Sequence, residues 1–205
     1  MPVIVVANPK GGVGKSTLST HIAGYFANQN QRVMLGDADR QQSSQLWLSL
    51  RPSTARAIAS WEVGDDQIAK PPKGITHAVI DTPAGLHGKR LKEVLKLAHK
   101  VVVPLQPSVF DIFATHDFLD ELAERVKTSQ TQVGIVAMRV DERTRAAEQL
   151  RTFVAATGLP VLGTLRDTQN YVQLAAHGLT VFDLAPERVA RDLEQWQPIC
   201  RWLDA

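Results

Sequence analysis

The sequence has one cysteine, no long apolar run and almost no excess of charge. Cys200, being alone, cannot form an internal disulfide or supply a thiolate metal site by itself. No apolar run approaches the length needed to cross a bilayer, and the segment after Met1 lacks the positive start of a signal peptide. The formal net charge of +2 does not by itself indicate a polyanionic partner. We therefore expect a cytoplasmic protein with no membrane association.

Short runs rich in valine and isoleucine alternate along the chain with stretches of helical periodicity. Runs that are apolar on both faces are typical of central parallel strands. The alternation predicts an α/β fold, a doubly wound and mostly parallel sheet flanked by helices, in one domain over residues 1–205. Pro198 is expected to end or kink the last helix. The expected strands are 3–7, 32–36, 77–80, 100–105, 133–140 and 159–165, and the expected helices are 16–28, 91–98, 118–126, 146–156 and 187–203.

A glycine-rich segment stands between the first expected strand and the first expected helix. Its glycines let backbone N–H groups converge on phosphate oxygens, and the helix N-terminus adds unpaired donors. Lys15 would neutralise the β- and γ-phosphates, and the Ser16 hydroxyl would ligate Mg²⁺. Pro9 replaces the first glycine of the strict phosphate-loop pattern, so a plain glycine-rich turn is the alternative. The expected nucleotide-binding residues are Gly11, Gly12, Val13, Gly14, Lys15, Ser16 and Thr17.

Three carboxylates follow two other expected strands. Asp37 and Asp39 come at the end of strand 32–36, and Asp81 ends the apolar run 77–80. Ligands of open α/β sheets lie beyond the carboxyl ends of strands, so these side chains can face the phosphates. Asp81 is the expected Walker-B carboxylate, which engages Mg²⁺ through its water shell. A solvated strand end with a helix-capping role is the alternative for the first two.

With Lys10 at its start, the loop resembles the deviant Walker motif Lys-Gly-Gly-x-Gly-Lys-Ser/Thr-Thr of the ParA/MinD superfamily. Residues 37–42 resemble that family's Asp-x-Asp-Pro-Gln segment, with Arg40 in place of the proline. The resemblance implies that Lys10 reaches the partner's phosphates across an ATP-dependent homodimer. It also implies that Asp39 positions the attacking water and that Asp37 supports the metal site.

The base of the bound nucleotide, and with it the cofactor, is predicted partly by elimination. The chain has no Asn-Lys-x-Asp tetrapeptide of the kind that selects guanine, so adenine is favoured, and the expected cofactors are ATP and Mg²⁺. Met138 stands where the ParA resemblance places a base-proximal asparagine. The lone Cys200 argues against an iron protein of the nitrogenase type. Mixed charges in the last helix argue against a membrane ATPase of the MinD type.

The resemblance implies a short ParA-type ATPase, which dimerises with ATP, binds DNA nonspecifically and segregates or positions a plasmid, a chromosome or a protein cargo. A small ParB/ParG-like or cargo adaptor protein would stimulate hydrolysis, and the ATP-bound form would associate with the nucleoid. Arg139, Arg143 and Arg166 are the candidate DNA contacts, although the sequence alone favours solvated helix faces for such scattered arginines. A small metabolic ATP-dependent enzyme on the same scaffold, similar to dethiobiotin synthetase, is the alternative.

Overall fold

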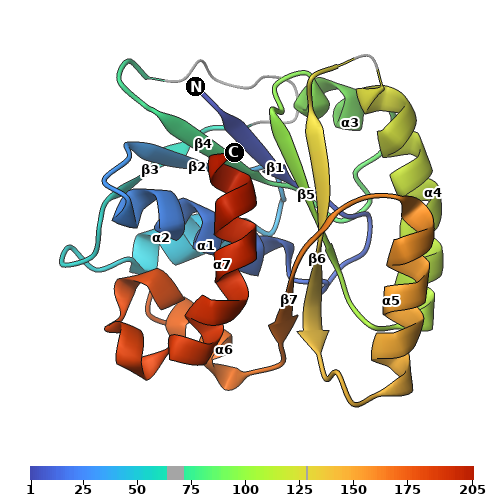
Figure 1. Ribbon diagram of the computed structural model, residues 1–205. Helices are drawn as coiled ribbons and strands as arrows, with labels where there is room; N and C mark the ends of the chain where they lie inside the picture. The colour runs from blue at the N-terminus through green and yellow to red at the C-terminus, as the bar shows by residue number, and fades with distance from the viewer. Residues whose placement is uncertain (64–71, 128) are drawn as a thin grey trace.

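Seven parallel strands form the central sheet of the computed structural model, which describes residues 1–63, 72–127 and 129–205 (Figure 1). The strand order is β3-β2-β4-β1-β5-β6-β7, and every pairing between neighbouring strands is parallel. The doubly wound prediction is therefore confirmed. The strands are β1 (Val3–Val6), β2 (Val33–Asp37), β3 (Ile58–Trp61), β4 (His77–Asp81), β5 (Lys100–Leu105), β6 (Gln132–Val140) and β7 (Val161–Arg166).

Helices cover both faces of the sheet because the central strands are apolar on both sides. Ile4 and Val6 pack with one set of helices, whereas Val3 and Val5 pack with the other. In Figure 1 the two helical layers lie on opposite sides of the strands. The first layer contains α1 (Lys15–Asn28), α2 (Ser43–Leu50), α6 (Gln169–Ala175) and α7 (Ala190–Asp204), and the second contains α3 (Gly88–Leu95), α4 (Val109–Val126) and α5 (Arg145–Thr157).

The chain changes its direction of travel across the sheet at β1. The strands β4 and β2 lie on one side of it and β5 and β6 on the other. A crevice forms at such a point beyond the carboxyl ends of the strands, and this is where ligands bind in doubly wound folds. The glycine-rich segment leaves β1 at this point. The topology therefore places the predicted phosphate loop at the ligand-binding edge of the sheet.

One strand and two α-helices were not expected from the sequence. β3, α2 and α6 are short, and β3 lies at the edge of the sheet in the stretch 51–74, where the sequence is least regular. Residues 64–71 of that stretch lie outside the described residues. Segments of four to eight residues show too few turns of either periodicity to stand out. Their existence depends on packing, as when Trp47 of α2 inserts into the core.

Of the two expected effects of Pro198, an end to the last helix is not found. α7 continues through Pro198 to Asp204. Trp196, Ile199 and Leu203 are buried on both sides of the proline, so contact with the sheet outweighs the backbone hydrogen bond that proline removes. Lys100 of β5 also donates to the carbonyl oxygens of Trp202 and Leu203, at 2.6 and 2.9 Å.

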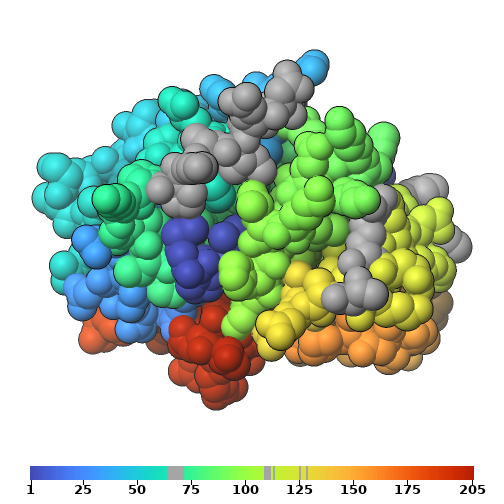
Figure 2. All heavy atoms as spheres, turned by 90° about the horizontal axis from the view of Figure 1, so that it is seen from above, coloured from blue at the N-terminus to red at the C-terminus, as the bar shows by residue number. Residues whose placement is uncertain are grey.

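Both ends of the chain emerge at the edge of the sheet where the strands begin. Figure 2 looks onto this edge and shows the first residues, in dark blue, beside the end of α7, in red. The ends therefore lie opposite the predicted phosphate loop. Among the described residues, no helix combines the length and the hydropathy that a membrane span requires.

Candidate nucleotide site

The loop from β1 to α1 is shaped by two glycines with left-handed backbone. Gly12 has φ 76° and Gly14 has φ 98°, a region that is open to glycine but strained for other residues. Gly14 is also the residue before the first turn of α1, which has no side-chain cap and no acidic residue. A Cβ on Gly14 would lie 2.7 Å from the Met138 methyl carbon. The first-turn N–H groups of α1 are therefore available to an anion.

Asn8, which the sequence analysis did not single out, braces the loop from beneath. Its side-chain amide donates to the carbonyl oxygen of Pro104 at 2.8 Å and to the hydroxyl of Thr115 at 3.2 Å. Its side-chain oxygen accepts from the backbone N–H of Lys10 at 2.8 Å. Asn8 is fully buried, so all these bonds are shielded from water. The only signal in the sequence was a polar residue directly after an apolar strand.

Lys15 is a buried cation whose ammonium donates to the carbonyl oxygen of Lys10 at 2.6 Å. Burial lowers the pKa of Lys15 below its ordinary value, and the negative charges of Asp81 and Asp39 partly oppose that shift. A cation placed among glycine N–H groups at a helix N-terminus is suited to a phosphate ligand. The geometry therefore agrees with the role that the sequence assigned to Lys15.

A cleft of about 680 Å³ opens over this loop. It brings together most of the predicted site, namely Gly11, Gly12, Gly14, Lys15, Ser16, Thr17 and Asp39. Four positively charged or titratable side chains that were not predicted as nucleotide ligands also line it: Arg40, His87, Arg90 and Arg139. A volume of this size accommodates a small-molecule ligand or cofactor.

Asp37 is held almost entirely by backbone donors. One carboxylate oxygen accepts from the N–H of Asp39 at 2.9 Å, and the other accepts from Ser44 and Gln45 at 2.8 and 3.2 Å. The last two bonds satisfy N–H groups in the first turn of α2. Asp37 therefore anchors α2 and the acidic loop in this structure, which is the capping role weighed as the alternative. Its proposed support of a metal remains a prediction.

Asp81 has a different environment. Its side chain is enclosed, and one oxygen accepts from the Ser44 hydroxyl at 2.7 Å while Oδ1 has no hydrogen-bond partner. Burial raises the pKa of Asp81 to about 6, although the hydroxyls of Ser16 and Ser44 favour its charged form. A buried carboxylate oxygen without a donor is an available acceptor for a cation or its water shell. Asp81 therefore fits the predicted magnesium role better than Asp37 does.

The residues of this site suit a Mg²⁺ ion that binds together with the phosphates of a nucleotide. Mg²⁺ is commonly held by one or two protein oxygens, several waters and the phosphates of its substrate. Ser16 and Asp81 supply such a sparse set here. Within residues 1–63, 72–127 and 129–205, no cluster of three or more histidine, cysteine or acidic side chains forms a cation cage. The nucleotide phosphates would supply the remaining ligands.

Met138 and Arg139 lie where β6 loses its regular register with β7. Met138 is buried against Gly14, so it supports the phosphate loop from the side. Arg139 has a left-handed backbone, with φ 51°, and lines the cleft. Left-handed backbone is unusual for a residue with a Cβ and is found where the surrounding structure holds it. Arg139, predicted as a DNA contact, therefore faces the candidate nucleotide site.

The other two predicted DNA contacts already have acidic partners. Arg143 is exposed and bonds both oxygens of Asp141, at 3.0 Å each. Arg166 donates through Nε to buried Asp192 of α7 at 2.9 Å. Both line a hollow of about 850 Å³ that also contains Arg191 and four acidic residues. The acidic residues are Asp141, Glu142, Asp167 and Glu194, so the hollow is not a basic surface.

Arg90 links the two loops that border the cleft. It lies in α3, directly after the loop that follows Asp81, and its guanidinium donates to the carbonyl oxygen of Ala38 at 2.7 Å. Ala38 stands between Asp37 and Asp39, and its own N–H donates to the carbonyl oxygen of Asp81 at 2.9 Å. The acidic loop is therefore connected both to β4 and to α3.

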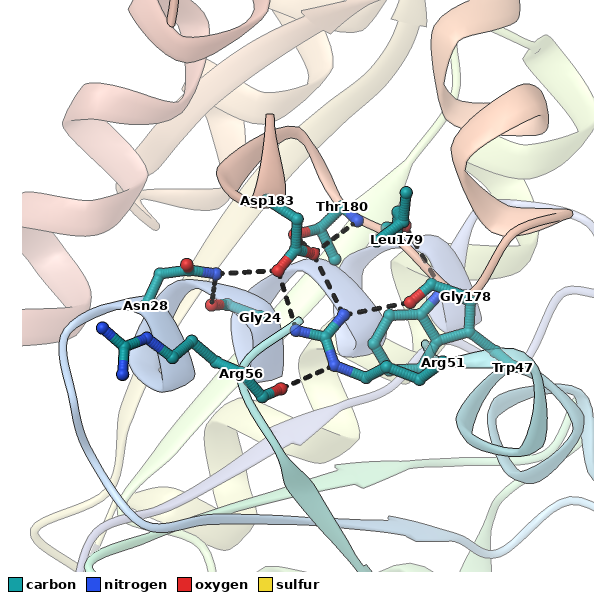
Figure 3. A network of polar contacts seen from close by, with 9 residues as sticks. All are labelled: Gly24, Asn28, Trp47, Arg51, Arg56, Gly178, Leu179, Thr180 and Asp183. Carbon is teal, nitrogen blue, oxygen red and sulfur yellow. Dashed lines mark hydrogen bonds and ion pairs between the residues drawn. The ribbon is translucent and has the colours of Figure 1, made fainter. Parts of the chain in front are cut away.

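The far end of α2 is held by a buried ion pair (Figure 3). Arg51 donates to both oxygens of Asp183, at 3.0 and 2.8 Å, and to the carbonyl oxygen of Gly178. Asn28 of α1 donates to the same carboxylate at 3.0 Å. Hydrogen bonds from Arg51, Asn28 and Thr180 outweigh burial and keep the pKa of Asp183 below its usual value. α2 is thus fixed at its start by Asp37 and at its end by Asp183.

Comparison with known proteins identifies a nucleotide-binding family. A family model described as "CobQ/CobB/MinD/ParA nucleotide binding domain" matches residues 4–181. The chain is 29% identical to the "Maintenance of carboxysome distribution protein A" of Gloeobacter kilaueensis over 185 residues, which cover 87% of this chain and 83% of the relative.

Two solved structures share the fold. The MinC:MinD cell division complex of Aquifex aeolicus aligns with a TM-score of 0.74 at 18% identity, over 99% of this chain and 95% of that one. Cobyrinic acid a,c-diamide synthase from Mycobacterium smegmatis, with bound ATP analogue and magnesium, aligns with a TM-score of 0.68 at 22% identity. That alignment covers 95% of this chain and 98% of the synthase. The synthase structure contains an ATP analogue and magnesium, which is consistent with the cofactors expected here from the sequence, ATP and Mg²⁺.

Proposed function

The chain belongs to the CobQ/CobB/MinD/ParA nucleotide binding domain family, and on that premise we propose that it is a ParA-like positioning ATPase. The proposed cycle consists of ATP binding, dimerisation, attachment to DNA, and hydrolysis stimulated by a small adaptor protein. The relative from Gloeobacter kilaueensis is named for carboxysome distribution, which favours a protein assembly over a plasmid as the cargo.

One observation carries the nucleotide part of this proposal. Lys15, Ser16 and the open N-terminus of α1 line one cleft beyond the carboxyl ends of the strands, and buried Asp81, which has an unpartnered oxygen, lies close enough to interact with both Lys15 and Ser16. Lys15 and the loop N–H groups would bind the phosphates, and Ser16 and Asp81 would hold Mg²⁺, which supplies charge neutralisation at the phosphates. Asp39 lines the same cleft and would orient the attacking water.

Lys10 would act across the dimer. Its backbone is fixed by Asn8 and by the Lys15 ammonium, so the side chain starts from a rigid point at the entrance of the loop. Two such loops facing each other would place each Lys10 near the nucleotide of the other subunit. The support for this step is the family's deviant Walker motif, which the chain carries in full from Lys10 to Thr17.

For DNA, we propose a surface that includes α3. Lys89, Lys92 and Lys96 recur at helical spacing and are exposed, with only Glu93 as an acidic neighbour on that helix. A row of lysines along one helix face suits a phosphate backbone. α3 also follows the loop after Asp81, so a change in that loop on nucleotide binding would alter the position of α3. The Arg143 and Arg166 hollow is a weaker candidate because acidic residues share it.

Mobility shifts on two unrelated duplexes test this function. With ATP and Mg²⁺ we expect binding to both duplexes, falling steeply with salt, and little binding with ADP. Changing Lys89, Lys92 and Lys96 together to glutamine should flatten the salt dependence, by about 0.9 in the slope for each lost phosphate contact. Arg143→Gln is the matched control and should change little.

Absence of DNA binding in every nucleotide state would reject the DNA step. Rapid ATP turnover that instead requires a small acid as phosphoryl acceptor would favour the metabolic alternative. Equal effects of the lysine changes and of Arg143→Gln would reject α3 as the DNA surface.

A further inference from the structure

Two buried carboxylates stand side by side where β2 and β4 end. Asp37 and Asp81 are register partners in this parallel pair, and they are 9% and 1% exposed. Neighbouring strands lie roughly 4.8 Å apart, so two charges at this position repel each other. Each carboxylate therefore needs donors that hold it in a defined orientation.

Ser44 supplies a donor to both. Its backbone N–H donates to Asp37 at 2.8 Å, and its hydroxyl donates to Asp81 at 2.7 Å. Ser44 is fully buried in the first turn of α2, so water does not compete for either bond. Hydrogen bonds between a hydroxyl and a carboxylate are among the stronger ones, and this one is short.

The two carboxylates differ in how many of their oxygens have a hydrogen-bond donor. Asp37 accepts three backbone N–H groups, and both of its oxygens are engaged. Asp81 has one oxygen on Ser44 and the other, Oδ1, without a partner. Because Ser44 engages Oδ2, the carboxylate cannot rotate freely, and Oδ1 is left as its open acceptor.

We propose that Ser44 is a positioning residue, whose hydroxyl fixes the Asp81 carboxylate so that Oδ1 remains directed at magnesium–ATP. The inference rests on the proposed ATPase function and deepens it. Ser44 is fully buried and is not among the residues that line the cleft. Its N–H bond to Asp37 also makes the aim of Asp81 depend on the position of α2, which Arg51 and Asp183 hold at the other end.

Magnesium-dependent nucleotide binding tests the proposal. A fluorescent ATP analogue is titrated in EDTA and then in rising Mg²⁺, with wild type, Ser44→Ala, Ser44→Thr and Ser49→Ala. Ser49 is an exposed serine of the same helix whose hydroxyl bonds only a carbonyl oxygen of its own helix, so it is the matched control. In EDTA all four should bind alike. In Mg²⁺, Ser44→Ala should need a roughly tenfold higher Mg²⁺ concentration for half-maximal nucleotide binding, because loss of a residue that orients a metal ligand commonly weakens metal binding by that much. Ser44→Thr, which keeps the hydroxyl, should restore the wild-type value.

Other results would overturn the proposal. An unchanged magnesium requirement in Ser44→Ala would show that the hydroxyl does not position Asp81. An equal loss of binding with and without Mg²⁺ would show a purely structural role. If Ser44→Ala fails to fold, Ser44→Thr and Ser44→Val, which differ only in the hydroxyl, provide the same comparison. A wild-type protein that binds no nucleotide even in Mg²⁺ would reject the ATPase function itself.

Discussion

At the scale of single residues, Asp37, Asp39 and Asp81 show how surroundings assign different tasks to three neighbouring carboxylates. Asp37 is surrounded by backbone N–H groups, and Asp81 keeps a buried oxygen open. Asp39 lines the cleft, and its carboxylate accepts from the N–H of Gln41 at 3.0 Å. The more accessible position suits contact with water.

Asp39→Ala should bind ATP with nearly wild-type affinity but hydrolyse it at least about tenfold more slowly, because the carboxylate that would orient the attacking water is lost. Calorimetric ATP binding and phosphate release, measured with the adaptor protein present, separate the two effects. Asp117→Ala removes a fully solvated carboxylate of α4 and serves as the control. Hydrolysis at the wild-type rate in Asp39→Ala would assign the water to another residue.

The burial of His21 predicts that the folded protein loses stability in mild acid. It is fully buried, stacks on Trp196 and bonds the carbonyl oxygen of Thr17 through Nδ1, while Nε2 has no partner. Burial lowers the pKa of His21 from 6.5 to about 4, and Asp183 and Asp192 oppose the shift only partly. Between these values the unfolded chain binds a proton that the folded chain excludes. Stability should therefore fall as the pH drops from about 6.5 towards 4.

Urea unfolding of wild type and His21→Phe between pH 7 and pH 4.5 tests this. The wild type should lose up to about 1.4 kcal/mol more per pH unit than the variant, which keeps a ring in the stack but cannot be protonated. Asp81, whose pKa is raised to about 6, acts in the opposite direction in both proteins and cancels in the comparison. Parallel pH profiles would contradict the assignment to His21.

At the scale of elements, α2 depends on its two ends more than on its own sequence. It has only eight residues, and two of its large apolar side chains, Leu46 and Leu50, are exposed. Helices this short are marginal alone, so the Asp37 cap and the Arg51–Asp183 pair contribute much of its stability. This is the element that carries Ser44, so its position bears on the proposed magnesium site.

Arg51→Ala should lower the free energy of unfolding by roughly 3–5 kcal/mol, because it leaves Asp183 buried without its cation. The side chains of the pair are 5% and 3% exposed. Lys127→Ala breaks the solvated pair with Glu124 and should cost less than about 1 kcal/mol. Denaturant titration of the two variants gives the comparison, and a similar small loss in both would show that the pair is dispensable.

At the scale of the whole molecule, the proposed cycle requires two copies. The cleft lies beyond the carboxyl ends of the strands. Both chain ends lie at the other edge of the sheet, where the strands begin (Figures 1 and 2). Two molecules can therefore meet through their clefts without interference from the termini.

Lys10→Ala should bind ATP but remain monomeric, because the lost ammonium would act on the phosphates of the other subunit. Size-exclusion chromatography with a slowly hydrolysed ATP analogue measures this. Wild type and Lys127→Ala should shift to a dimer under the same conditions. Dimerisation of Lys10→Ala with normal ATP turnover would remove the role across the interface.

The sequence by itself determined the parallel sheet and the phosphate loop. Both depend on local patterns, since strands apolar on two faces need helices on both sides, and the glycines between strand and helix have left-handed backbone that few other residues adopt. The order of the loop and the acidic strand ends was enough to predict one site, and the cleft contains Lys15 and Asp39 as expected.

Only the tertiary structure decided which partners those residues have. Asn8 meets Thr115 across 107 positions of the chain, and Ser44 meets Asp81 across 37. Such pairings depend on how strands and helices pack, which no local pattern specifies. Arg139 likewise lies at a register irregularity of β6 and lines the candidate nucleotide cleft, and Asp192 engages Arg166 from α7. The tertiary contacts thus separate arginines that are alike in sequence, because a side chain's role follows from the charges and surfaces that folding brings to it.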